Sequence, residues 1–358
     1  MCSSDLAHED KGQGMTPFTI GSHEIAAGTR ATVELPVSVL SNHTPMTLPV
    51  HVVHGRKPGP ALFISGVVHG DEIQGVEIIR RVLRHRAMAD IAGTLLAIPI
   101  VNAFGFLNHS RYMPDRRDLD RSFPGSDQGS LASLLADLFM REVVSRAQYG
   151  IDLHTAALHR TNLPQIRIAP DEAELLSLAE TFGAPVILVS RLREGTLRQC
   201  ARDAGVRMLL YEGGEALRFD EVAIRAGTLG ILRVMRALGM ISSLDVATGR
   251  VPPALSHSST WLRAPEGGIL RTRRTIGDRV TSGEALGEIS DPLGAHTVAI
   301  SSDCDGIIVG RTNLPIVNRG DALYHVARMK DPDTSRARVR YIGGAMAQAP
   351  LFDEDVII

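Results

Sequence analysis

Residues 61–83 read ALFISGVVHGDEIQGVEIIRRVL and carry the clearest secondary-structure signal in the chain. The continuous apolar run over residues 61–68 is typical of a buried strand, and the apolar residues of 73–83 recur at helical spacing. The polar group His69-Gly70-Asp71-Glu72 lies between the two. In open α/β sheets such a position is the carboxyl end of a strand, where ligands bind.

The same alternation extends along the chain. Apolar runs predict further strands at residues 94–101, 149–154, 184–189 and 206–211, after a β-like region over residues 18–53. Helical spacing predicts helices at residues 131–144, 172–181, 197–204 and 229–238. We therefore predict an α/β domain with a mixed central sheet flanked by helices over residues 15–245, after a flexible tail at residues 1–14.

The pattern changes after about Ser243. Pro252-Pro253 and the serine-rich Ser256–Ser259 predict a linker. Beyond it an internal repeat places apolar residues and a glycine three apart, first at Val280, Gly283, Leu286 and Ile289 and again at Val317, Gly320, Leu323 and Val326. We predict a small all-β domain at residues 258–330 in which each half completes the core of the other. Residues 331–358 follow as a C-terminal extension with little pattern.

This repeat resembles the β module of biotinyl and lipoyl carriers. Such a carrier needs a lysine that can be modified, and no lysine occurs between Thr260 and Arg328. We therefore expect a structural role for this module rather than that of a carrier.

Composition narrows the class of protein. The chain has 358 residues, 44% of them apolar, and its 38 basic and 40 acidic residues nearly cancel. A nucleic-acid binder would show a basic excess and more than 4% aromatic residues, so we expect no nucleic-acid partner. Three scattered cysteines, no long apolar run and no signal-like start predict a cytoplasmic protein without a membrane partner. Exposed β edges leave a homo-oligomer open.

Three polar residues at strand ends form a candidate metal site. His69 and Glu72 are three residues apart, so that a turn can point both at one ion, and His154 ends the strand of residues 149–154. Two histidines and one glutamate are the ligand set of a catalytic zinc with a position left for water. Spacing alone also allows histidines that are merely hydrogen-bonded. Glu212, which follows a third strand, is either a general base or a residue that caps the turn at Gly213.

The loop from Asn102 to Gly125 is rich in arginine, including Arg111 and Arg121. Arginine forks suit planar carboxylates, so this loop is a candidate site for an anionic substrate group. The alternative is a solvated loop whose arginines pair with its own aspartates, among them Asp120.

Four motifs occur together and in order: Gly66-Val-Val-His-Gly-Asp-Glu72, Asp118-Leu-Asp-Arg-Ser-Phe-Pro-Gly125, Ile151-Asp-Leu-His-Thr155 and Tyr211-Glu-Gly-Gly214. In these motifs the chain resembles the succinylglutamate desuccinylase/aspartoacylase family, which has a zinc carboxypeptidase-like fold. The resemblance implies one zinc ion per chain, bound by His69, Glu72 and His154. It also implies that Glu212 activates the water and later protonates the leaving amine.

The resemblance further implies that Arg121 and Arg111 hold a substrate carboxylate. The family usually has asparagine where this chain has Asp120, so Asp120 either locks Arg121 in place or faces a cationic group of the substrate. We take Asn102 as a further candidate substrate contact. The stretches Arg160–Arg167, with Arg160 and Asn162, and Arg193–Arg198 also resemble elements of the family's substrate pocket. Resemblance to longer members of the family implies that the C-terminal β domain caps or shapes the rim of the active site.

The sequence thus predicts a zinc-dependent amidohydrolase that removes an acyl group from an N-acyl amino acid or a related small amide. A metallocarboxypeptidase acting on short peptides would share the zinc ligands. A non-catalytic metal- or ligand-binding protein is the third alternative. Another divalent ion could also occupy a site of two histidines and one glutamate.

Overall fold

The computed structural model of the chain describes residues 15–242 and 252–329. The predicted flexible tail at residues 1–14 and the C-terminal extension at residues 331–358 lie outside the described residues.

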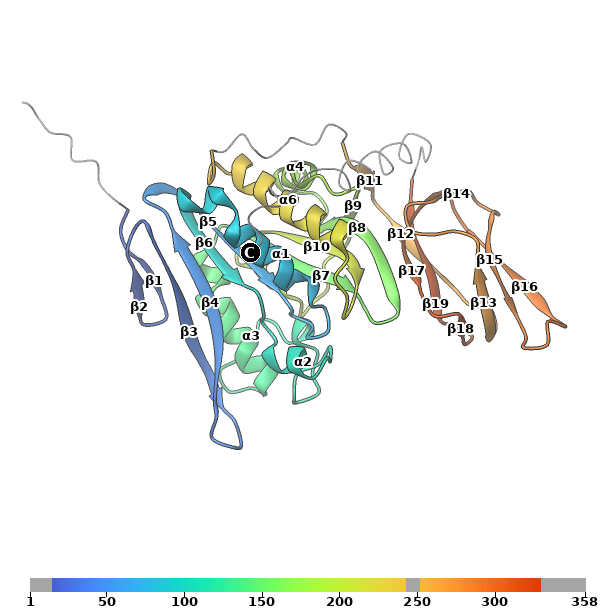
Figure 1. Cartoon of the computed structure of the whole chain (residues 1–358), viewed down its shortest axis with the longest axis horizontal. Helices are drawn as coiled ribbons and strands as arrows, with labels where there is room; N and C mark the ends of the chain where they lie inside the picture. The colour runs from blue at the N-terminus through green and yellow to red at the C-terminus, as the bar shows by residue number, and fades with distance from the viewer. Residues whose placement is uncertain (1–14, 243–251, 330–358) are drawn as a thin grey trace, which may run out of the picture.

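The centre of the molecule is a mixed sheet (Figure 1). Four parallel strands form its middle, in the order β10 (Arg207–Glu215), β7 (Tyr149–Ala156), β5 (Lys57–Gly66) and β6 (Ala92–Ile98). Antiparallel neighbours extend it on both sides: β4 (Pro45–His54) and β3 (Thr29–Val39) beyond β6, and β8 (Arg160–Ile168) beyond β10. The short strand β9 (Val186–Val189) pairs with β8, and β1 (Phe18–Ile20) with β2 (His23–Ile25) forms a separate hairpin.

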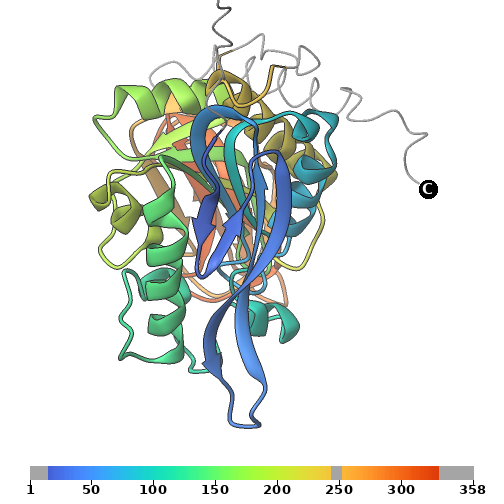
Figure 2. The same ribbon diagram turned by 90° about the vertical axis from the view of Figure 1, so that its left-hand side faces the viewer.

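Helices cover both faces of this sheet, as Figure 2 shows in a view toward the edge of the sheet formed by β3 and β4. The helices α1 (Gln74–Arg84), α4 (Ala173–Phe182) and α6 (Glu221–Ala237) pack on the face that carries Leu62 and Ile64 of β5. The helices α3 (Leu131–Glu142) and α5 (Leu197–Asp203) pack on the face that carries Phe63. Because successive side chains of a strand point to opposite faces, one apolar strand serves two cores. The α/β prediction is confirmed.

Short helical elements complete the domain: α2 (Ala103–Leu107) and the 3₁₀ turns η1 (Arg86–Ala89), η2 (Leu119–Arg121) and η3 (Val144–Arg146). One helix boundary differs from its prediction by more than two residues. Helix α6 begins at Glu221 rather than at Leu229, because the Asp220 side chain accepts a hydrogen bond from the backbone of Ala223 and caps the first turn. No helix in the described ranges has the length and apolar character needed to cross a membrane.

The C-terminal residues form short strands, as the repeat predicts. Four of them make a separate sheet: β13 (Gly268–Thr272), β15 (Ala285–Ser290), β16 (Thr297–Ser301) and β18 (Ile316–Val317). The others, β12 (Ser259–Arg263), β14 (Arg279–Val280), β17 (Gly306–Thr312) and β19 (Ala322–Arg328), join the central sheet. Repeat positions such as Val280, Leu286, Leu323 and Val326 fill the core between the two sheets.

The boundary between the two regions is less of a linker than predicted. Strand β17 pairs antiparallel with β8, so the central sheet runs on into the C-terminal strands. Residues Ala254–Ser256 form strand β11, which pairs with β9. The prediction of a linker at Ser256 is wrong, because the Ser256 hydroxyl is buried and bonds to backbone oxygens, including that of Arg328.

Candidate active site

The three predicted metal ligands come together at the carboxyl ends of β5 and β7. His69 follows β5, Glu72 precedes α1, and His154 lies in β7, which is paired with β5. Each of the three offers a ligand atom, and these atoms all lie within 4.8 Å of one another. His69 Nδ1 is 2.8 Å from one oxygen of Glu72, and His154 Nδ1 is 2.9 Å from the other. All three side chains are buried.

The far nitrogen of each ring faces a second carboxylate. His154 Nε2 lies 2.7 Å from Asp152, whose other oxygen accepts a hydrogen bond from Ser65. His69 Nε2 lies 3.2 Å from Asp118. Carboxylates in this position orient metal-ligating histidines and raise their basicity. Both rings therefore have Nδ1 directed to the centre of the cluster.

The electrostatics of the cluster suit a doubly charged cation. Burial lowers the pKa of His69, but Glu72 and Asp118 outweigh it and raise this pKa to about 9. Burial also opposes the charge on His154, yet Asp152 and Glu72 hold its pKa well above the ordinary value. Two protonated rings among carboxylates amount to two positive charges, which a divalent ion would supply instead. The residues present thus fit a metal of the zinc type.

Arg111, a predicted substrate contact, is paired at the rim of this cluster. Its guanidinium donates two hydrogen bonds to one oxygen of Asp118, at 3.1 and 3.0 Å, and a third to Glu72 at 3.2 Å. It also lines the cavity described below. In this arrangement Arg111 fixes the carboxylate of Glu72, a candidate metal ligand, and that of Asp118, which faces His69.

Glu212 lies beside His154, since the two are paired residues of the neighbouring strands β10 and β7. Strand β8 holds the carboxylate from the other side. The Asn162 amide donates to one oxygen at 2.5 Å, and Arg167 lies 3.1 Å from the other. A carboxylate that lies next to a candidate metal site and is fixed by two donors fits the position expected of a general base.

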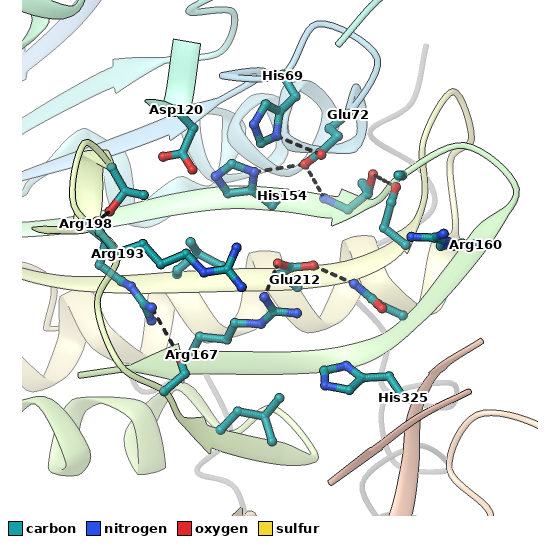
Figure 3. A pocket seen from close by; sticks show the side chains of 18 of the residues that line it. His69, Glu72, Asp120, His154, Arg160, Arg167, Arg193, Arg198, Glu212 and His325 are labelled. Atoms are coloured by element: carbon teal, nitrogen blue, oxygen red, sulfur yellow. Dashed lines mark hydrogen bonds and ion pairs between the residues drawn. The ribbon is translucent and has the colours of Figure 1, made fainter. Parts of the chain in front are cut away.

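The candidate metal ligands His69, Glu72 and His154 and the carboxylate of Glu212 open into one cavity of about 680 Å³ (Figure 3). Arginine dominates its wall, with Arg111, Arg121, Arg160, Arg167, Arg191, Arg193 and Arg198. Residues of the C-terminal strands also line it, namely Ser259, Trp261 and His325. The cavity is therefore built from both parts of the chain.

Asp120 and Arg121, both predicted substrate contacts, line the cavity and bind each other. Arg121 donates to one oxygen of Asp120, and the other oxygen accepts from the backbone of Leu197 at 3.3 Å. Both oxygens of Asp120 are thus engaged within the protein.

Asn102 is the one predicted contact that the structure does not bring to the cavity. Its side chain is fully buried and caps α2 by accepting a hydrogen bond from the backbone of Gly105. The amide group faces the backbone oxygens of Val68 and Arg111 at 3.5 and 3.4 Å. Asn102 supports the loop that carries Arg111.

Several residues of the cavity were not singled out individually from the sequence. Arg167 and Arg198 are the last residues of the stretches Arg160–Arg167 and Arg193–Arg198, which resemble parts of the family's substrate pocket. No sequence pattern indicates Trp261 or His325. Burial, reinforced by Arg167, lowers the pKa of Arg198 to about 10, and Arg198 donates hydrogen bonds to neutral oxygens such as Ser190 Oγ. The strand pairing β8–β17 brings the C-terminal residues here, and single-sequence patterns carry no signal for it.

Comparison with known proteins agrees with the geometry. Residues 58–238, half of the chain, match the sequence profile of the succinylglutamate desuccinylase/aspartoacylase catalytic domain. The chain is 26% identical over 295 residues to N-alpha-acetyl-L-2,4-diaminobutyric acid deacetylase from Halomonas elongata, covering 79% of this chain and 86% of that protein.

Two solved structures share the fold. The succinylglutamate desuccinylase/aspartoacylase from Rhodobacter sphaeroides is 26% identical, with a TM-score of 0.75 over 84% of this chain and 96% of that one. The ectoine utilization protein EutE (DoeB) from Ruegeria pomeroyi is 19% identical, with a TM-score of 0.77 over 89% of this chain and 100% of that one.

The fold, the site and these relatives define a hydrolase that acts on amide bonds. The chain belongs to the succinylglutamate desuccinylase/aspartoacylase family.

Proposed function

We propose that this enzyme removes the acyl group from an N-acyl amino acid or a related small amide, using one zinc ion per chain. His69, Glu72 and His154 would hold the ion. The observation that carries the proposal is the position of Glu212, beside His154 on the adjacent strand and in the same cavity as the cluster.

A divalent metal held by these residues would supply Lewis acidity to the acyl carbonyl and make water more acidic. Glu212 takes a proton from the attacking water at its carboxylate and returns it to the nitrogen of the departing amine. Asn162 and Arg167 keep the carboxylate aimed during both transfers, because each binds one of its oxygens. Arg111 keeps Glu72 and Asp118 in place.

The cavity supports a small substrate that carries negative charge. Its volume is in the range of small-molecule sites, and seven arginines line it. Arginine forks bind carboxylates in a planar, bidentate manner. An N-acyl amino acid offers such a carboxylate, and the diaminobutyrate derivative named for the Halomonas relative is one candidate.

The test is amine release by the zinc-loaded protein from a panel of N-acyl amino acids, N-acyl diamines and short peptides. We expect release from one acyl class, and a loss of about 10²–10⁴-fold in the Glu212→Gln variant. Zinc content of the variant, measured by mass spectrometry, should match that of the native protein. Normal turnover by Glu212→Gln would refute the assignment of the base. Cleavage of peptides alone would identify a carboxypeptidase instead.

A further inference from the structure

Arg160 differs from several other arginines of the cavity in what holds it. Arg111, Arg121 and Arg167 each pair with a carboxylate. In the described part of the chain no carboxylate pairs with Arg160, and its Cζ lies 5.5 Å from the ring centroid of Trp261. A guanidinium within about 6 Å of an indole centroid is held by a cation–π interaction. Its hydrogen-bond donors remain available to a ligand.

The indole is itself fixed by a cross-strand partner. Trp261 and His325 face each other in the β12–β19 pair, and their rings stack at 4.7 Å with an interplanar angle of 6°. His325 Nε2 lies 2.8 Å from the hydroxyl of Ser259. Burial, followed by the charge of Arg167, lowers the pKa of His325 to about 3. The imidazole is therefore neutral at physiological pH and adds no positive charge to the arginines.

The strand register connects this stack to the catalytic carboxylate. Asn162, which binds Glu212, is paired with Gly310 of β17, Gly310 with His325 of β19, and His325 with Trp261 of β12. Residues paired in this way share one face of a sheet. The wall that carries Trp261 is thus held in register with Glu212. Figure 3 shows Arg160 on the side of the cavity opposite to Arg193 and Arg198, with Glu212 between them.

We propose that the C-terminal strands are part of substrate recognition: Trp261, supported by His325, positions Arg160 to bind a carboxylate of the substrate. This inference rests on the proposed deacylation and specifies the charge of its substrate. Arg160 makes the contact, and Trp261 and His325 are positioning residues. The C-terminal strands thereby do more than cap the rim.

Binding can be measured without turnover, because Trp261 is the only tryptophan of the chain. We would titrate zinc-loaded Glu212→Gln protein and follow Trp261 fluorescence. The ligands are three pairs that differ in one carboxylate: N-acetyl-L-alanine and its amide, N-acetyl-L-glutamate and N-acetyl-L-glutamine, and N-succinyl-L-alanine and N-butanoyl-L-alanine. We expect the charged member of at least one pair to bind about tenfold more tightly. The responding pair identifies which carboxylate is bound.

The matched control is an exposed arginine of the C-terminal strands that does not line the cavity. Arg160→Gln should abolish the preference for the charged ligand. Arg271→Gln removes the same charge from an exposed position of β13, outside the cavity, and should retain the preference. Equal binding within all three pairs would overturn the inference, and so would equal losses in the two variants.

The positioning role is tested by a double-mutant cycle, with affinities measured by calorimetry. Trp261→Leu should weaken binding of the charged ligand about fivefold, and Trp261→Phe should restore most of the affinity. In the Arg160→Gln background Trp261→Leu should have no further effect, since the indole acts through Arg160. Additive losses would refute that role. Amine release without a carboxylate preference would refute this inference but not the proposed deacylase activity. A carboxylate preference without any amine release would refute the deacylase activity but not this inference.

Discussion

Asp120 stands where the family resemblance leads us to expect asparagine, and the structure gives it two partners. One oxygen binds Arg121 and the other accepts a hydrogen bond from the backbone of Leu197, where α5 begins. This geometry favours the first of the two roles considered above, in which Asp120 locks Arg121. A cationic substrate group would have to compete with Arg121 for the carboxylate.

Replacing Asp120 with asparagine should therefore release Arg121 for substrate. Asparagine can keep the bond from Leu197 but loses the ion pair, and the cavity gains one positive charge. We expect KM for N-acyl amino acids to fall several-fold. Unfolding free energy should change by less than about 1 kcal/mol, because the Arg121 side chain is 41% exposed. Steady-state kinetics and urea unfolding measure the two effects. An unchanged or higher KM would contradict a locking role.

His325 should make stability depend on pH. Its folded pKa of about 3 lies below the ordinary value of 6.5, so the unfolded chain takes up a proton at this site first as the pH falls. The contribution of His325 is complete above about pH 6.5 and is lost as the pH falls toward 3. Relative to His325→Phe, the native protein should lose about 1.4 kcal/mol of unfolding free energy per pH unit in this window. Urea unfolding of both proteins from pH 7 to pH 4 gives the difference in unfolding free energy at each pH. A difference that does not change with pH would refute the lowered pKa of His325.

The cluster residues could be predicted because each is marked by its place in the chain. His69, His154 and Glu212 directly follow or end apolar runs, and the ends of parallel strands meet at one edge. Trp261 and His325 carry no such mark. Their place in the cavity depends on the register of three strand pairs, which is a property of the folded sheet.

Strand β17 contributes to the geometry of the active site through a glycine, which has no side chain. Gly310 lies between Asn162 and His325, and a Cβ added there would approach Asn162 Oδ1 to 2.6 Å. The glycine leaves the space in which the Asn162 amide reaches Glu212.

Gly310→Ala should accordingly impair catalysis through Asn162. The new methyl group would displace the amide, and we expect kcat/KM to fall about tenfold with a loss of about 1–3 kcal/mol of stability. Circular dichroism and kinetics check the two effects. Asn162→Ala should reproduce the catalytic loss, and the double variant should be no worse than Asn162→Ala alone. Full activity of Gly310→Ala would show that the amide adapts.

Helices and strands with strong periodicity were predicted within a few residues, and the misses have physical causes. The first two turns of α6 include Gly227 and Thr228, which are weak helix formers, so that the strong helical pattern begins only at Leu229 although Asp220 caps the helix earlier. The serines near β11 resemble a linker, but the buried hydroxyl of Ser256 satisfies backbone groups across the fold.

One sheet joins the α/β region to the C-terminal strands. Strands β8 and β17 pair, and an apolar cluster spans the seam, including Val186 and Leu188 of β9 with Ile307 and Val309 of β17. The two predicted domains therefore share a core as well as a cavity.

We expect the two regions to unfold together. In urea, the fluorescence of Trp261 reports on the C-terminal strands, and far-ultraviolet circular dichroism reports mainly on the helices of the α/β region. Their midpoints should coincide, because exposing the seam would cost both regions apolar contacts and hydrogen bonds. Two separated transitions would show that the regions are independent. Zinc-loaded protein should give the same coincidence at a higher midpoint.

The pairing of β8 with β17 also constrains how specificity can change. Asn162, which aims the base, and Arg160, which faces Trp261, are two residues apart on the strand that carries this seam. The position of Arg160 and the position of Asn162 are therefore fixed relative to each other by the backbone of β8. A shift of this strand would move both residues together. New substrates would have to be accommodated by exchanging side chains along β8, while the distance between these two positions of the strand stayed the same.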